Sequence, residues 1–158
     1  MLTKVRTEVN VVHVQSVSFS VILDAPNADA LLRAYAEECL VPDATPQRLI
    51  YEAMEGAGAL KCFAAYAEGT LLIGFCSILV ARMPHTGHLL ATGESIFVDS
   101  ACRDTGAGNL LINAAEQYAD SICAPLSWLP RVDSAFDKVL SRRPGYSRTH
   151  SQYTRWQA

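Results

Sequence analysis

The sequence predicts an α/β (α+β) fold in which one mixed β-sheet carries helices on both faces. Residues 60–67, 70–83 and 88–98 are rich in β-branched and apolar residues and are separated only by tight turns, which predicts an antiparallel meander. A loop, an amphipathic helix and a further strand follow the meander. A meander joined to such a β-loop-α-β unit requires strands of both directions in one sheet. The predicted order is βααβββαβαβ.

The first strand is predicted over the β-branched stretch Val9–Val14. The next segment, Ser16–Leu23, fits two descriptions. It alternates polar and apolar residues as a strand does, but Ser18 could also cap a short helical turn.

Two helices are predicted between this region and the meander. Asn27 or Asp29 can cap the first, in which apolar residues recur at helical spacing until Pro42 ends it. Pro46 stands at the predicted first position of the second helix, which ends near Gly56.

The elements after the meander follow the same reasoning. Residues 99–105 predict a loop, and Gly106 opens a helix with one apolar face. A strand is then predicted over Ile122–Leu129, a helix over Val132–Leu140 and a last strand over Arg148–Trp156.

Composition limits the class of protein. The chain has 158 residues, 50% hydrophobic and 18% charged, which predicts one globular domain over residues 1–158. Its longest apolar stretch, Leu71–Ala81, is far shorter than the roughly 20 residues of a membrane-spanning helix, and no apolar signal segment is visible at the N-terminus. Five cysteines without a C-x-x-C pair predict reduced thiols in the cytoplasm. The net charge of −3 makes nucleic-acid binding unlikely, although residues 131–158 are locally basic.

The segment from Glu94 to Asn113 is the most informative for function. A strand ends at Val98, and the pattern R-x-x-G-x-G, formed by Arg103, Gly106 and Gly108, then opens a helix. Backbone N–H groups at a helix start attract anions, and glycines allow close approach, so the segment predicts a pyrophosphate site. A P-loop would need a Lys after the glycines, and a dinucleotide fingerprint would need a third glycine where this chain has Leu111.

This segment resembles the acetyl-CoA-binding motif of the GCN5-related N-acetyltransferase (GNAT) superfamily. The element order fits as well, and the resemblance extends from about Ala28 to the carboxyl end. The segments 35–38, 84–87 and 94–98 further resemble small GNAT proteins carried by phages and prophages.

The resemblance implies acetyl-CoA as cosubstrate, and no metal. Backbone groups of Ile96, Phe97 and Val98 would pair with the pantetheine arm, and an amide near Val98 would polarise the thioester carbonyl. The pyrophosphate would be held by N–H groups of the following loop and helix start, namely Arg103, Asp104, Thr105, Gly106, Ala107, Gly108 and Asn109.

Glu94 is the candidate general base that the resemblance implies, since an ammonium must lose a proton before it can attack. A partly buried carboxylate on this strand suits that task. Strand alternation predicts that Ser95 points to the opposite face, so that only one of the two faces the site. The alternative is that Glu94 is a solvated or ion-paired strand residue.

The last helix departs from the family pattern. Ser141 stands where many members have a tyrosine that protonates the departing thiolate, and Ser134 replaces the usual asparagine. Either Tyr146 or Tyr153 supplies the proton, or the thiolate leaves unassisted, which a thiol pKa near 8.5 makes tolerable.

The predicted function is transfer of an acetyl group from acetyl-CoA to a primary amine of an unknown acceptor. The alternative is a catalytically weak or inactive binding or regulatory protein on the same scaffold, which Ser141 favours. A homodimer is expected because the family often dimerises. His85 and His88 flank a turn without a third ligand, so no metal site is predicted there. Cys102 precedes Arg103, which could lower its thiol pKa, but packing as a small residue is favoured over catalysis.

Overall fold

The computed structural model describes residues 11–39 and 45–149. The chain forms two compact units, residues 1–128 and residues 129–158. The described elements of the first unit are β1 (Val12–Val17), α1 (Phe19–Leu23), α2 (Ala28–Glu38), α3 (Arg48–Gly56), β2 (Leu60–Ala67), β3 (Leu71–Arg82), β4 (Leu89–Val98), the 3₁₀ helix η1 (Ser100–Thr105), α4 (Ala107–Ser121) and β5 (Leu126–Ser127). The second unit contains α5 (Ala135–Arg142).

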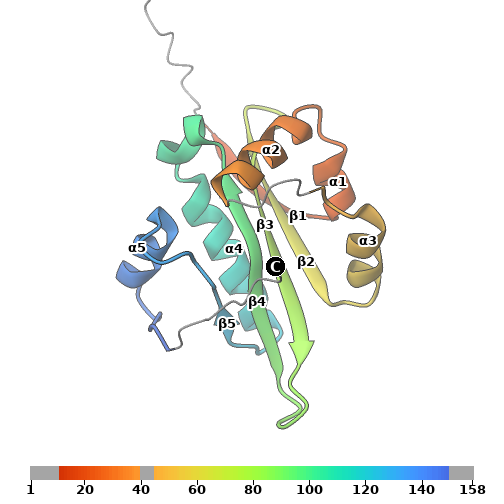
Figure 1. Cartoon of the computed structure of the whole chain (residues 1–158), viewed down its shortest axis with the longest axis vertical. Helices are drawn as coiled ribbons and strands as arrows, with labels where there is room; N and C mark the ends of the chain where they lie inside the picture. The colour runs from red at the N-terminus through yellow and green to blue at the C-terminus, as the bar shows by residue number, and fades with distance from the viewer. Residues whose placement is uncertain (1–10, 40–44, 150–158) are drawn as a thin grey trace, which may run out of the picture. The chain divides into compact units, whose positions relative to one another are not determined.

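The sheet of the first unit has five strands in the order β1-β2-β3-β4-β5. Strands β1 to β4 are antiparallel to their neighbours, and β5 is parallel to β4. Helices α1, α2 and α3 lie over one face and α4 lies over the other (Figure 1). The predicted mixed sheet with helices on both faces is therefore confirmed, and β2 has the predicted bounds.

The N-terminal region differs from its prediction in register. The first strand is Val12–Val17 rather than Val9–Val14, because it pairs from Val12 to Val17 along β2. Residues 9 and 10 lie outside the described part. The ambiguous segment divides, since β1 continues to Val17 and α1 then begins with Ser18 at its N-cap position. Three helices rather than two thus stand between β1 and β2 in the observed order.

The starts of α2 and α3 differ from the predicted capping pattern. Asn27 occupies the N-cap position of α2, but its amide Nδ2 donates a hydrogen bond to the Leu72 carbonyl at 2.7 Å instead of capping the helix. This bond ties the start of α2 to β3. Helix α3 begins at Arg48, with Gln47 at its N-cap position, so Pro46 precedes the helix rather than opening it.

The strand predicted over Ile122–Leu129 is wrong in length, since β5 contains only Leu126 and Ser127. Helix α4 continues to Ser121, and Cys123 adopts a positive φ of 53° that breaks the chain direction. Few residues are then left for pairing with β4. The 99–105 segment is also more regular than predicted, because η1 forms there.

The second unit begins its helix later than predicted. Asp133 has a positive φ of 62°, and the Ser134 hydroxyl accepts a hydrogen bond from the Asp137 N–H, which caps α5. The helix is therefore Ala135–Arg142 rather than Val132–Leu140. Of the last predicted strand, Arg148 and Thr149 are not in a strand, and residues 150–156 lie outside the described part.

Two buried clusters form the core of the first unit, one on each face of the sheet. The cluster under α4 combines strand residues with the inner face of that helix, including Leu111 and Ala115. The cluster on the other face includes Phe19, Leu31, Phe75 and Phe97. Strand alternation produces this division, because successive side chains of β2 and β3 point to opposite faces.

Candidate active site

A β-bulge in β4 organises the site. Ser77 of β3 pairs with Ser95, whereas the next residue, Ile78, pairs with Gly93. Glu94 is therefore an extra residue without a partner in the ladder. A bulge interrupts the alternation of side chains, and here it brings Glu94 and Ser95 to the same partner.

The Ser77 hydroxyl joins these two side chains. Its Oγ donates to Glu94 Oε2 at 2.9 Å and is also hydrogen-bonded to the Ser95 hydroxyl. A hydroxyl has one proton to donate, so the Ser95 hydroxyl is the donor to Ser77. The prediction that only one of Glu94 and Ser95 faces the site is wrong, because the bulge changes the register between them.

Tyr51 of α3 supplies a second hydroxyl to Glu94. Burial raises the pKa of Tyr51 to about 12, and the charge of Glu94 and a hydrogen bond to it add to the effect. The ring of Tyr51 stacks on Phe19 of α1, with centroids 3.7 Å apart and planes inclined by 6°. We call Glu94, Ser77, Ser95 and Tyr51 the Glu94 cluster.

Tyr35 of α2 lies beside this cluster and packs edge-on against Phe75 and Phe97. Burial raises the pKa of its phenol, with smaller contributions from Cys39 and Glu94. The phenol therefore stays protonated at neutral pH and presents a neutral aromatic wall near the carboxylate.

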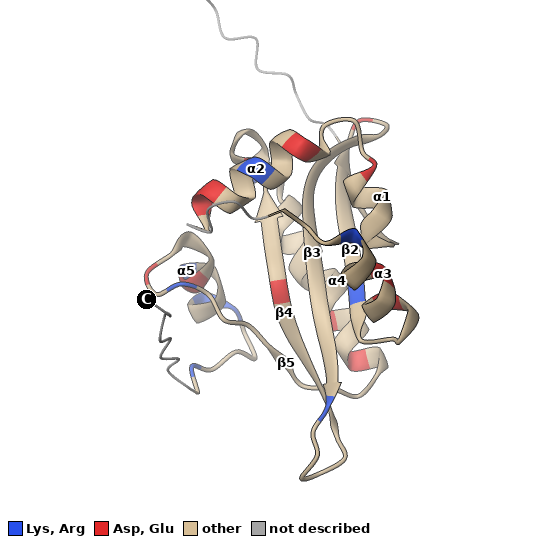
Figure 2. Cartoon of the chain, turned by 45° about the vertical axis from the view of Figure 1, so that its right-hand side comes forward, with Lys and Arg blue, Asp and Glu red and all other residues tan. Residues whose placement is uncertain are grey.

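The Glu94 side chain is exposed although two hydroxyls hold it. It is the one acidic position of β4, red in Figure 2. The expectation of a partly buried carboxylate is thus replaced by an anchored but accessible one. Such a group can meet an incoming amine without moving away from its partners.

The edge of β4 next to Glu94 is largely open. β5 pairs with β4 only at Ala91 and Thr92, so no strand of the described residues pairs with that edge from 93 to 98. The side chain of Trp128, just after β5, lies directly against Gly93. A Cβ on Gly93 would be 2.0 Å from Trp128 Cε3, so only glycine fits there. The backbone groups of this edge that have no strand partner among the described residues can accept an extended, amide-containing ligand, although the Val98 carbonyl already accepts from Arg103.

The predicted anion loop lies just beyond the end of β4. Gly106 adopts a φ of 84° and begins α4, whose first N–H groups have no acceptors within the helix. The loop is fixed internally, since Asp99 accepts from the Ala101 N–H at 2.9 Å and Thr105 Oγ1 donates to the Cys102 carbonyl at 2.6 Å. An ideal Cβ at Gly108 would lie 4.0 Å from Val98 Cγ2, which shows how closely the helix start follows the strand end.

The Arg103 side chain is directed away from the helix start. Its Nε donates to the Val98 carbonyl at 3.1 Å, and its guanidinium forms an ion pair with Glu38 at the end of α2. The guanidinium also lies 5.6 Å from the centroid of the Phe97 ring. The Arg103 side chain thus connects η1, β4 and α2.

The remaining predicted site residues are placed as follows. Ile96 and Val98 pack toward α4, and Phe97 packs toward Tyr35 on the opposite face. Asp104 is exposed and belongs to η1, and Asn109 is exposed in the first turn of α4. Ala107 is fully buried in the α4 cluster. Burial raises the pKa of the Cys102 thiol, with added effects of Asp99 and Asp104, so the expected lowering by Arg103 is wrong.

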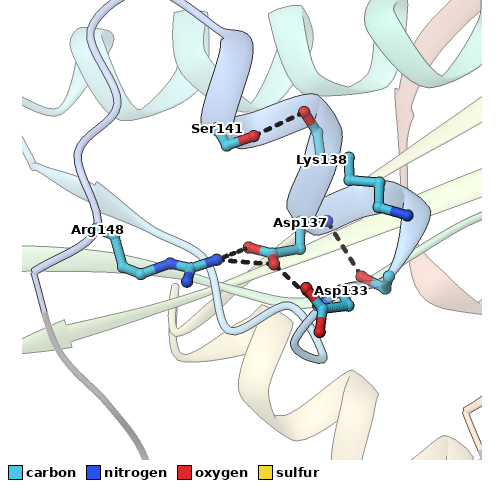
Figure 3. A network of polar contacts seen from close by, with 6 residues as sticks. Asp133, Asp137, Lys138, Ser141 and Arg148 are labelled. Carbon is cyan, nitrogen blue, oxygen red and sulfur yellow. Dashed lines mark hydrogen bonds and ion pairs between the residues drawn. The ribbon is translucent and has the colours of Figure 1, made fainter.

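The second unit holds a separate polar network, shown in Figure 3. Arg148 donates to both carboxylate oxygens of Asp137, at 2.7 and 2.8 Å, and the Asp133 N–H donates to the same group at 3.0 Å. These hydrogen bonds hold the pKa of Asp137 below its usual range. The Ser141 hydroxyl donates to the Lys138 carbonyl at 2.9 Å.

Tyr146 also belongs to this unit and is half-buried, with its N–H bonded to the Arg143 carbonyl at 3.4 Å. Tyr153 lies outside the described residues. Because Arg148 is tied to α5, the chain on both sides of Tyr146 is anchored to that helix.

Within 11–39 and 45–149, no three His, Cys, Asp or Glu side chains are grouped as a metal site. No helix in those same ranges combines the length and the apolar character needed to cross a bilayer.

Sequence reasoning missed Ser77 and Tyr51. They lie 17 and 43 positions before Glu94 in the sequence, on β3 and α3, and neither belongs to a recognisable motif. Only the pairing register and the placement of α3 bring them to the carboxylate. A polar residue in the otherwise apolar run of β3 was the one available signal for Ser77.

Comparisons with known proteins support the fold and the family that the sequence resembles. The profile of the acetyltransferase (GNAT) family matches residues 28–136, more than half of the chain. No curated protein matches. Three solved structures are similar in fold. One is an aminoglycoside acetyltransferase from an uncultured soil metagenomic sample, with 16% identity, a TM-score of 0.71 and coverage of 93% of this chain and 97% of that one.

The other two have similar coverage. A ribosomal-protein-alanine N-acetyltransferase from Brucella melitensis biovar Abortus 2308 has 22% identity, a TM-score of 0.68 and coverage of 92% and 99%. A glucosamine-6-phosphate N-acetyltransferase from Arabidopsis thaliana has 14% identity, a TM-score of 0.71 and coverage of 92% and 98%. None of these matches supports the expected resemblance to phage-encoded members.

Proposed function

The chain belongs to the acetyltransferase (GNAT) family, and we propose that it transfers an acetyl group from acetyl-CoA to a primary amine by direct attack. The observation that carries the proposal is the position of Glu94. Its carboxylate is exposed, is anchored by Ser77 and Tyr51, and lies on the strand whose edge is open toward a ligand. A base, a binding edge and an anion site thus follow one another along one segment.

Residues at the end of β4 and the start of α4 would bind the cosubstrate. The backbone of Ile96, Phe97 and Val98 would pair with the amides of the pantetheine arm, because the edge from 93 to 98 lacks a strand partner among the described residues. The loop and helix start, residues 103–109, would hold the pyrophosphate through N–H groups and the positive end of α4.

Glu94 would act as the general base. A protonated amine gives its proton to the carboxylate, and the neutral nitrogen attacks the thioester carbonyl carbon. The new C–N bond forms a tetrahedral intermediate whose oxyanion is stabilised by an amide near Val98. Collapse of the intermediate breaks the C–S bond, releases the thiolate of coenzyme A and leaves the acetylated amine, whose remaining extra proton passes to water.

Ser77 and Tyr51 would serve as positioning residues for this base. Both hydroxyls donate to Glu94, so the carboxylate has lone pairs left for the amine while its orientation stays fixed. The donation from Ser95 to Ser77 extends this chain of hydrogen bonds by one group.

Tyr146 is the proposed proton donor to the departing thiolate. A phenol is a much stronger acid than an aliphatic hydroxyl, and the Ser141 hydroxyl already donates to the Lys138 carbonyl. Comparison of Tyr146→Phe with Ser141→Ala tests this role. Lower turnover in the tyrosine variant alone supports it, and unchanged turnover in both contradicts it, which leaves Tyr153 or unassisted departure of the thiolate.

The acceptor is proposed as a primary amine without a further commitment. The similar structures carry names of enzymes for aminoglycosides, a ribosomal-protein alanine and glucosamine-6-phosphate, and all three substrates present an amine. A panel should therefore contain an aminoglycoside, an amino sugar phosphate and peptides with free N-termini.

Calorimetric titration with acetyl-CoA, followed by the amine panel, tests the proposal. We expect saturable binding and acetylation of at least one class of amine. Folded protein that does not bind acetyl-CoA would refute the proposal. Binding without transfer to any amine would support the second candidate, a binding protein on the same scaffold, which the engaged Ser141 hydroxyl favours.

A further inference from the structure

A pocket lies on the face of the sheet that α4 covers, away from the open edge of β4. It lies between α4 and the strands β1 and β2, and its volume is about 490 Å³. This is within the roughly 300–1,000 Å³ of small-molecule sites. All of its lining residues belong to the first unit.

The pocket has an apolar floor and a polar rim. Phe63 of β2 and Val14 of β1 form part of its apolar wall. Asn113 and Gln117 of α4 are exposed and place amide groups at the rim. Such a surface suits a ligand with an apolar body and polar substituents.

Lys61 gives the pocket its charge. Its Nζ lies 5.9 Å from the centroid of the Phe63 ring and 5.8 Å from that of Tyr118, so the two rings hold the ammonium at the pocket. No Asp or Glu lines the pocket, and no carboxylate of the described ranges forms an ion pair with Lys61. An ammonium beside two aromatic rings, with no carboxylate partner among the described residues, favours an anionic ligand.

We propose that this pocket binds a small organic anion, a planar apolar body that carries one carboxylate or phosphate. The anionic group pairs with Lys61, the body packs on Phe63 and Tyr118, and the exposed amide of Gln117 hydrogen-bonds to the rest. The site is independent of acetyl transfer.

The two sites are separated by the sheet itself. Glu94 is bonded to Ser77 and to Tyr51 of α3, on the face of the sheet that α1 to α3 cover. The pocket lies on the α4 face at β1, the edge strand opposite β5. A ligand there would contact α4 from the end of its first turn, at Leu110, and further on at Asn113.

The test is a titration of the ¹⁵N-labelled full chain with benzoate, followed in ¹H–¹⁵N spectra. We expect saturable shifts at the backbone amides of Lys61 and Gln117, both with and without coenzyme A. Benzyl alcohol, which has no charge, and inorganic phosphate, which has no apolar body, should each bind more weakly. The readout needs no acetyl transfer, so it stands apart from the function proposed above.

Lys61→Met should weaken benzoate binding by roughly tenfold or more, because a charged hydrogen bond is lost. Lys138→Met, the matched change in the second unit, should leave it unchanged. Gln117→Glu, an exposed change on α4 that adds a like charge at the rim, should weaken it by about threefold. Equal affinity of Lys61→Met, of benzyl alcohol or of phosphate would overturn the proposal, as would the absence of binding at millimolar benzoate.

Discussion

The two faces of the sheet are built from the same four antiparallel strands, but they differ in chemistry. The cluster under α4 consists of apolar residues, among them Ile73, Ile78 and Leu111. The opposite cluster is also apolar, yet the buried hydroxyls of Ser77 and Ser95 and the phenol of Tyr51 lie on its side of the sheet. One inserted residue in β4, at Glu94, accounts for much of this difference.

The difference teaches that a bulge can place polar groups on a packed face without leaving them unsatisfied. Within the described ranges, no buried side-chain nitrogen or oxygen lacks a hydrogen-bond partner. Ser77, Ser95 and Glu94 satisfy one another, with Tyr51 added from α3. We therefore expect substitutions on the α4 face to change stability and substitutions in the Glu94 cluster to change turnover.

The largest effect is expected for Glu94→Gln, which keeps the shape of the side chain and removes the base. Turnover at neutral pH should fall by roughly 10² to 10⁴-fold, the usual contribution of a general base. The loss should shrink at high pH, where the amine is already free. Steady-state kinetics across pH measure this, with the exposed turn residue changed in Glu68→Gln as the control. Equal turnover of both variants at neutral pH would contradict the role of Glu94.

The next largest effect is expected on the face of the sheet that α4 covers. Leu111 is fully buried under α4, so Leu111→Ala should lower the free energy of unfolding by about 2–5 kcal/mol. Its neighbour Leu110 is 37% exposed, and Leu110→Ala should cost much less. Denaturant titration gives both values. Turnover per folded molecule should stay close to that of the unchanged protein, and a large loss of turnover would show that the two faces are not separable.

Gly93 lies where the pairing of β4 with β5 ends and the unpaired edge of β4 begins, so a substitution there tests this boundary. A methyl group there would collide with the ring of Trp128, so Gly93→Ala should cost about 1–3 kcal/mol of stability through overpacking. The control is Gly56→Ala, a helical position where a Cβ would meet nothing within 4 Å. Thermal unfolding distinguishes them. If Gly93→Ala were as stable as Gly56→Ala, Trp128 would not be fixed against β4.

These two faces were not equally predictable from the sequence. The apolar runs gave the bounds of β2 and nearly those of β3 and β4, because burial imposes a period that a single chain displays. The glycine-led start of α4 was equally visible, since Gly106 must adopt a positive φ.

The sequence predicted only part of the Glu94 cluster, for a physical reason. The motif pointed to Glu94, but a bulge depends on how β4 pairs with β3, and that register is set by packing of the whole sheet. The same limit applies to β5, where the positive φ of Cys123 and the position of Trp128 decide the length of the strand. Neither the backbone conformation of Cys123 nor the position of Trp128 produces a periodic pattern in the sequence.

The smallest expected effect is that of Tyr51→Phe, which removes one hydrogen bond to Glu94 and keeps the ring stacked on Phe19. Turnover should fall by about threefold to tenfold, the value of one hydrogen bond. Tyr66→Phe is the control, since burial raises the pKa of that phenol without any part for Glu94. It should leave turnover unchanged.

The Tyr51 phenol also predicts a pH dependence of stability. Its pKa is 10.0 in the unfolded chain and about 12 in the folded protein, so the unfolded state loses this proton first as pH rises. The contribution to stability is complete below pH 10 and is lost between pH 10 and about 12. Tyr51→Phe should therefore make the free energy of unfolding fall less steeply in that interval. Identical slopes for the variant and the unchanged protein would mean that the Tyr51 phenol is neither buried nor held against the carboxylate, and Glu94 would then be anchored by Ser77 alone.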